Sequence, residues 1–288
     1  MLPMTRKQHC LLLAVVTVLF VSCQSVPGDS SRALFFETAI ITKEDIEEAV
    51  RIEAELATTY RTPPPDGHPW FQTLPGTSRA LVVAGHATAH MREGRLKPED
   101  AGTGSLAVML NRLARSPAIY TTHQSPSDPN YYDDNDFKHA LSQMLKQYEP
   151  VVALDLHASH FNRPYDVDFG TVGGTALLGR SGLLRLLAAS LEKEGLRNFS
   201  QDFFPAARQQ TITKWVSRHG VPAIQLEFNS TWLLPPEGSS DHALQRQRFA
   251  QLLQALTRFA YTVDNRQAEG GPRVSGEAPP KERSDFED

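Results

Sequence analysis

The chain has 288 residues, 40% hydrophobic and 22% charged, which is a composition typical of a folded globular protein with ample material for a core. Its formal net charge is −4, and it has no basic tract with interleaved aromatic residues. Nucleic acid is therefore excluded as the main partner, because phosphate binding needs a basic face.

The N-terminal segment over residues 1–22 has the features of an export signal. Arg6 and Lys7 are positively charged, and the apolar run over 11–21 is too short to span a bilayer comfortably. The following Phe20-Val21-Ser22-Cys23 resembles the lipobox of bacterial lipoproteins, with phenylalanine in place of the more usual leucine. That resemblance implies acylation of Cys23 and a lipoprotein anchored to a membrane of the bacterial cell envelope, facing the periplasm or the exterior. An ordinary signal peptide with an incidental cysteine is the alternative.

Cysteine usage limits the chemistry of the mature chain. The other cysteine, Cys10, lies inside the predicted signal, so Cys23 is the only one left. The folded domain then has no intramolecular disulfide, no cysteine ligand and no cysteine nucleophile. Any metal must be held by histidine and carboxylate side chains.

Beyond a polar tether at 23–34, helical patterns alternate with short apolar strands. Thr42 and Asp45 resemble a capping box that starts a helix, and the prolines at 63–65 should follow its end. Residues 120–136 are rich in Asp, Asn, Ser and Pro, which is typical of a long irregular loop. Further helices are expected near 106–113, 137–148, 183–191 and 243–261, and strands over 80–85, 151–156 and 224–228.

This alternation predicts an α/β fold with a mainly parallel, mixed sheet and helices on both faces. We expect one domain over residues 35–263. The tail at 264–288 is rich in Gly, Pro and charge, which is typical of disorder.

Each predicted strand leads into a residue that could bind a metal or work beside one. These residues are His86, His157 and Glu227. Ligand crevices of α/β proteins form at the carboxyl ends of the strands. On its own, His157 is either a ligand or a buried imidazole paired by hydrogen bonds, and Asp155 could orient it. Glu227 is suited to be a general base for a metal-activated water, or it forms a salt bridge to a helix arginine.

His86 and His90 form a His-x-x-x-His pattern, which on a helix places both imidazoles on one face. Here His86 directly follows a strand, Gly94 interrupts soon after, and Ala87 stands where zinc proteases have glutamate. We expect one of the two histidines to bind metal. His86 is favoured by its position at a strand end, and His90 would then be a polar loop residue.

The order of these motifs resembles the N-formylglutamate amidohydrolase family, which is related to the zinc carboxypeptidases and poly-γ-glutamate hydrolases. The resemblance spans about residues 78–235 and rests on His86, the segments 100–107 (DAGTGSLA) and 155–157 (DLH), and the segment 225–229 (QLEFN). It implies a zinc-carboxypeptidase-like fold. It also implies that His86 and His157 bind Zn²⁺, and that Glu227 is the general base and proton shuttle.

The same resemblance implies that Asp100 is the third ligand. It precedes Ala101-Gly102-Thr103, as the corresponding ligand of the poly-γ-glutamate hydrolases precedes a Pro-Gly-Thr segment. Glu99 is the alternative.

An arginine follows each of two histidines at the same spacing in the sequence. Arg163 comes six residues after His157, and Arg92 six after His86. Either could clamp a substrate carboxylate or stabilise an oxyanion, or could be a solvated surface charge. Arg163 is favoured because it shares the loop of the metal histidine, in which Asp166, Asp168 and Thr171 could shape the pocket.

These features favour a lipid-anchored zinc amidohydrolase that cleaves an amide or peptide bond in a small substrate. The chain has no Gly-x-Ser-x-Gly elbow and no P-loop lysine, so serine hydrolase and nucleotide-binding functions are disfavoured. A catalytically inactive binding lipoprotein on the same fold is the alternative, since aspartate replaces glutamate at the third ligand position.

Overall fold

The computed structural model describes residues 39–236 and 243–268. The signal segment 1–22, the lipid attachment site Cys23 and the tether at 23–34 lie outside the described residues, so these predictions stay predictions. Within the described part of the chain, no helix combines the length and the apolar character needed to cross a membrane.

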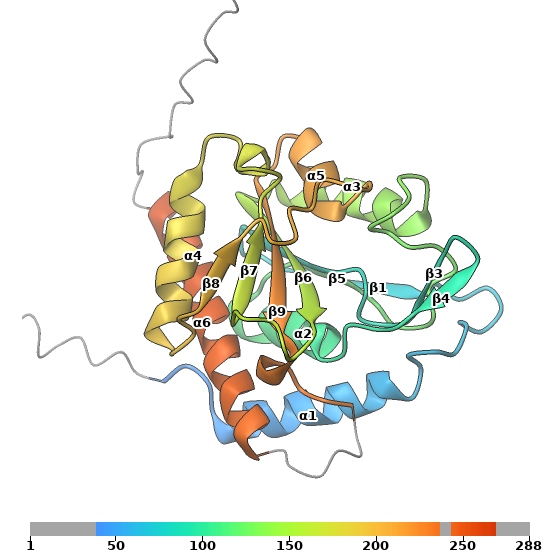
Figure 1. Ribbon diagram of the computed structural model, residues 1–288, viewed down its shortest axis with the longest axis horizontal. Helices are drawn as coiled ribbons and strands as arrows, with labels where there is room; N and C mark the ends of the chain where they lie inside the picture. Colours follow the sequence, from blue (N-terminus) through green and yellow to red (C-terminus); the bar gives the residue numbers. More distant parts are fainter. Residues whose placement is uncertain (1–38, 237–242, 269–288) are drawn as a thin grey trace, which may run out of the picture. The chain divides into compact units, whose positions relative to one another are not determined.

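A seven-stranded mixed sheet forms the centre of the domain, with the order β1-β5-β2-β6-β9-β7-β8 (Figure 1). Strands β5, β2, β6 and β9 run parallel to their neighbours in this series, whereas β1 and β7 are antiparallel to β5 and β9. The strands are β1 (Phe71–Leu74), β2 (Ala80–Ala84), β5 (Ala118–Thr121), β6 (Val152–Ser159), β7 (Val167–Gly170), β8 (Phe199–Gln201) and β9 (Ala223–Asn229). The predicted mainly parallel, mixed sheet is therefore confirmed.

Helices cover both faces of this sheet, as predicted, because alternate residues of each central strand enter different cores. In β2, Val82 packs in the core beneath one set of helices, and Leu81 and Val83 pack in the core on the other face. The first face carries α1 (Lys43–Ala57), α2 (Thr103–Ala114), α4 (Ser181–Lys193) and α6 (Ala243–Ala268). The second carries α3 (Asp136–Tyr148) and α5 (Ile212–Arg218).

Several element boundaries differ from those expected. The helix α6 continues to Ala268, so residues 264–268, which were expected in the disordered tail, are helical. Strand β5 occupies the start of the expected loop at 120–136. A separate two-stranded sheet of β3 (His90–Arg92) and β4 (Arg95–Lys97) was not expected. These additional strands are three or four residues long, too short to show a periodic pattern.

The register of the parallel strands positions the site. Strand β6 continues through His157 to Ser159, and β9 continues through Glu227 to Asn229. His157 and Glu227 are direct register partners on these neighbouring strands. His86 follows β2, which pairs with β6 on its other side. The three residues singled out in the sequence therefore lie at one edge of the sheet, with His157 inside β6 rather than after it.

Candidate active site

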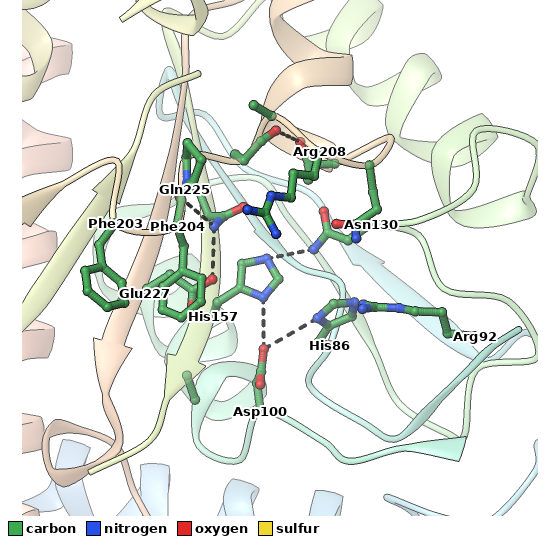
Figure 2. Close-up of a pocket in the computed structure, with 16 residues that line it drawn as sticks. His86, Arg92, Asp100, Asn130, His157, Phe203, Phe204, Arg208, Gln225 and Glu227 are labelled. Carbon is green, nitrogen blue, oxygen red and sulfur yellow. Dashed lines mark hydrogen bonds and ion pairs between the residues drawn. The ribbon is translucent and has the colours of Figure 1, made fainter. Parts of the chain in front are cut away.

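His86, Asp100 and His157 direct polar atoms toward one point (Figure 2). The Asp100 Oδ2 atom lies 2.9 Å from His157 Nδ1 and 3.6 Å from His86 Nδ1. One ligand atom from each residue lies within 4.8 Å of the other two, which is a spacing that could hold a metal ion. The structure thus brings together the three predicted ligands, while their binding of a metal stays a prediction.

The backbone around Asp100 explains why this carboxylate faces the histidines. The Asp100 N–H donates to the carbonyl of His86 at 2.7 Å, which joins the two ligand segments directly. The Asp100 carbonyl in turn accepts from the Thr103 N–H and hydroxyl, at 3.2 and 2.7 Å. The alternative ligand, Glu99, points elsewhere and pairs with Arg61 at 3.1 Å.

A carboxylate lies behind each imidazole. The Nε2 atom of His86 is 2.8 Å from Asp128 Oδ1, and Nε2 of His157 is 3.2 Å from Asp155 Oδ1. Asn130 Nδ2 also lies 2.7 Å from His157 Nε2. Metal-binding histidines commonly have such partners on the outer nitrogen, which orient the ring. Two inward Nδ1 atoms, one carboxylate and this outer support fit the donor set of a zinc site.

His90 forms a second buried group with His86 and Asp128. Its ring stacks on that of His86 at 3.8 Å between centroids, with an interplanar angle of 5°. The Arg92 guanidinium binds the same Asp128 carboxylate, and this positive charge opposes a second metal there. His90 and Asp128 therefore hold the His86 ring in place rather than forming a second metal site. The expectation that His90 is a polar loop residue is wrong, because it lies in β3 and is only 3% exposed.

The charges of the cluster are coupled. Burial opposes ionisation of Asp100, but hydrogen bonds from His157 and His86 hold the pKa of its carboxyl well below the usual range. Burial likewise opposes the charge on His157, but Asp155 and Asp100 raise the pKa of its imidazole well above the usual value. The two imidazoles thus favour the ionised form of the Asp100 carboxyl. A metal ion bound at the same nitrogens could take over that role.

Glu227 faces the pocket next to this cluster (Figure 2). Burial raises the pKa of its carboxyl to about 7, although the nearby His157 acts in the opposite direction. Gln225 Nε2 donates to Glu227 Oε1 at 2.9 Å and fixes the side chain. A carboxyl group that titrates near neutral pH can both accept and return a proton.

The pocket in front of these residues has a volume of about 400 Å³ and is also lined by Arg92, Arg208, Phe203 and Phe204. Arg163 is not part of the described wall. Its guanidinium lies over the rings of Phe203 and Phe204, at 5.5 and 5.1 Å from their centroids. A direct role of Arg163 in substrate binding therefore stays a prediction, and the arginines that line the pocket are Arg92 and Arg208.

Asp168 shapes this wall through the backbone. Its buried carboxylate accepts the N–H groups of Phe203 and Phe204, at 3.1 and 2.8 Å. Asp166 and Thr171 act on neighbouring loops. Asp166 accepts the N–H groups of residues 197 and 198, and Thr171 donates its N–H to Asp202 at 2.6 Å.

Asp128, Asn130 and Arg208 were not recognised in the sequence. The first two lie in the Asp- and Asn-rich stretch at 120–136, where their composition indicates only a loop. Arg208 lies in an irregular segment between β8 and α5 that has no periodic pattern. Their roles depend on tertiary contacts, so no local signal could identify them.

Fold and site together define an α/β protein with a buried histidine–carboxylate cluster able to hold a metal ion, and with a carboxyl group of raised pKa beside it. No protein-family model and no curated protein matches the chain. Among solved structures, it is similar to N-formylglutamate amidohydrolase from Ralstonia eutropha JMP134, with 15% identity and a TM-score of 0.48, over 67% of this chain and 98% of that one.

Two further solved structures are similar at comparable levels. A bacteriophage poly-γ-glutamate hydrolase has 12% identity and a TM-score of 0.40, over 69% of this chain and 88% of the other. A metallo-carboxypeptidase from Burkholderia cenocepacia has 10% identity and a TM-score of 0.41, over 77% and 70%. Because identities and TM-scores are this low, activity has to be inferred from the geometry of the site.

Proposed function

We propose that the chain is a zinc-dependent amidohydrolase that cleaves an amide or peptide bond. The observation that carries this proposal is the convergence of His86 Nδ1, His157 Nδ1 and Asp100 Oδ2 beside Glu227 in a pocket. A site made only for structural stability has no need of a pocket or of a carboxyl group with a pKa near 7.

His86, Asp100 and His157 would hold Zn²⁺, which when bound polarises a carbonyl and lowers the pKa of water. Glu227 accepts a proton from the attacking water and returns it to the nitrogen of the departing amine. Gln225 keeps the carboxylate oriented through its hydrogen bond to Oε1. Arg92 and Arg208 line the same pocket and offer guanidinium groups for negative charge on the substrate or on the developing oxyanion.

The reach of Asp100 supports catalysis over an inactive binding protein. Replacement of glutamate by aspartate shortens the side chain, which is the reason for expecting lost chemistry. Asp100 nevertheless lies within 3.6 Å of the inward nitrogens of both histidines. Its position on the segment that donates to the His86 carbonyl makes up for the shorter side chain.

We propose further that the enzyme is tethered to a membrane of the cell envelope through acylated Cys23. The support is the signal-like segment followed by Phe20-Val21-Ser22-Cys23. A small amide or peptide in that compartment would then be the substrate. Incorporation of a labelled fatty acid into the wild type but not into Cys23→Ser tests the anchor, and an unlabelled wild-type protein would rule it out.

The test of function uses the zinc-loaded protein and a panel of acyl amino acids, γ-glutamyl peptides and cell-wall peptides, with released amine as the readout. We expect hydrolysis by the wild type and about a 10²- to 10⁴-fold lower kcat in Glu227→Gln at unchanged zinc content. Glu192→Gln, an exposed residue of α4, makes the same chemical change away from the pocket and should behave as wild type. Wild-type turnover in Glu227→Gln, or no turnover of the panel by the zinc-loaded wild type, contradicts the proposal.

A further inference from the structure

A buried carboxylate lies on the helix α1, away from every motif that the sequence singled out. Glu53 is only 1% exposed, although burying a carboxylate is costly unless it has partners. Its Oε1 atom accepts from the Gly102 N–H at 2.8 Å and from the Tyr60 hydroxyl. Its Oε2 atom has no hydrogen-bond partner among the described residues. A buried carboxyl group with an unsatisfied oxygen needs a structural reason, which lies in the parts of the chain that it contacts.

Gly102 is the N-cap of α2, directly before the first helical residue, Thr103. The first N–H groups of a helix lack acceptors within the helix, and a side chain at the N-cap usually supplies one. Gly102 has no side chain to do so, and its φ of +85° is in the left-handed region. Glu53 supplies an acceptor from a different helix, and its carboxyl group lies at the positive end of the α2 dipole.

This first turn of α2 is continuous with the candidate ligand Asp100. The Asp100 carbonyl accepts from the Thr103 N–H and hydroxyl, so residues 100–103 form one hydrogen-bonded turn. Tyr60, the second partner of Glu53, accepts the Ala89 N–H on its carbonyl at 2.9 Å. The Glu53–Tyr60 pair therefore contacts both segments of the chain that carry the first two ligands, His86 and Asp100.

We propose that Glu53 is a positioning residue of the candidate metal site: its carboxylate caps α2 from outside and holds Asp100 against His86 and His157. This inference rests on the proposed function, because it takes those three residues to bind a metal. Glu53 does not line the pocket and contacts Gly102, at the start of α2, and Tyr60.

The test measures metal affinity and coordination rather than activity. Wild type, Glu53→Ala and Glu53→Gln are titrated with Zn²⁺ against a competing chelator, and with Co²⁺ while the visible d–d absorption is recorded. We expect Glu53→Ala to bind Zn²⁺ about 10- to 100-fold more weakly and to show an altered Co²⁺ spectrum. Glu53→Gln keeps an acceptor for the Gly102 N–H, so it should restore most of the affinity. Glu55→Ala, on the exposed side of the same helix, should match the wild type.

Wild-type affinity and an unchanged Co²⁺ spectrum in Glu53→Ala overturn the inference while leaving the proposed function in place. If Glu53→Ala does not fold, Tyr60→Phe decides, because it removes one partner of the carboxylate. A severalfold loss of affinity in Tyr60→Phe is then expected, and unchanged affinity and spectrum contradict the inference. A wild-type protein that binds neither Zn²⁺ nor Co²⁺ contradicts both the inference and the proposed function.

Discussion

Each histidine of the candidate site has different surroundings at its two ring nitrogens. The Nδ1 atoms face Asp100, and the Nε2 atoms face Asp128 and Asp155. Asp155 is itself held by the Thr213 N–H and hydroxyl, at 3.3 and 3.1 Å. The inward nitrogens are thereby oriented toward the same carboxylate before any metal binds. Preorganised ligands of this kind reduce the cost of ordering a site when the metal arrives.

The pKa of Glu227 gives a prediction at the same scale. Burial raises it to about 7 in the metal-free protein, so the side chain remains protonated at mildly acidic pH and becomes a carboxylate only near neutrality. Because the folded protein holds this proton more tightly than the unfolded chain, the contribution of Glu227 to stability falls as pH rises from about 4.5 to about 7. Bound Zn²⁺ should lower the pKa, since a nearby cation favours the carboxylate.

The measurement is a ¹³C NMR titration of glutamate side chains in the metal-free protein. A resonance with a midpoint near 7 that disappears in Glu227→Gln is expected, and it should move to lower pH when zinc is added. Glu53 also titrates near 7, because burial raises its pKa, so the variant is needed for the assignment. A midpoint near 4.5 for Glu227 in the metal-free protein would falsify the account of this residue.

Sequence could predict some site residues and not others for a physical reason. His86, His157 and Glu227 follow strongly apolar runs, and the position of a polar residue after such a run is a local signal. Asp128 and Glu53 give no such signal. One lies in a loop of ordinary polar composition and the other among several acidic residues of α1, and only the packed structure shows that each is buried.

At the scale of elements, the start of α2 is constrained both by close packing and by a left-handed backbone conformation. A side chain at Gly102 would place its Cβ 2.8 Å from Leu233 Cβ and from the Leu234 carbonyl oxygen, in addition to the strain of a φ of +85°. Gly94 has a similar φ of +71°, but a Cβ there would meet nothing within 4 Å. A comparison of alanine substitutions at the two positions therefore separates the energetic cost of backbone strain from that of steric overlap.

We predict that Gly102→Ala is destabilised by about 2–5 kcal/mol, which combines about 1–2 kcal/mol of left-handed strain with the cost of overpacking. Gly94→Ala should lose only the strain, about 1–2 kcal/mol. Urea denaturation of both variants and the wild type measures the free energies of unfolding. Equal losses in the two variants would show that the close packing of Gly102 against the segment after β9 carries no energy.

The elements that sequence predicted well are the long, periodic ones. The helix α1 begins at the expected capping box, in which the Thr42 side chain accepts from the Asp45 N–H and Asp45 accepts from the Thr42 N–H. The short strands β1, β7 and β8 were missed because three or four residues cannot display a period. Strand β6 was expected to end before His157, since its polar end resembles a loop, but pairing with β9 extends it.

At the scale of the whole described domain, the strand order of the sheet brings the site residues together. Residues 86, 157 and 227 lie far apart in the chain, and the order β2-β6-β9 places them at one sheet edge. The antiparallel β7 then brings Asp168 opposite Glu227 and fixes the aromatic wall of the pocket. An α/β topology could be predicted from the alternation of elements, whereas this strand order could not, because it is set by long-range pairing.

The central claim is that one zinc ion lies between His86, Asp100 and His157. Crystals of the zinc-loaded protein, with diffraction data collected on both sides of the zinc absorption edge, test it most directly. We predict one anomalous peak about 2.0–2.3 Å from His86 Nδ1, His157 Nδ1 and an Asp100 carboxylate oxygen. The absence of a peak at these atoms, or a peak against His90 and Asp128 instead, would contradict the account.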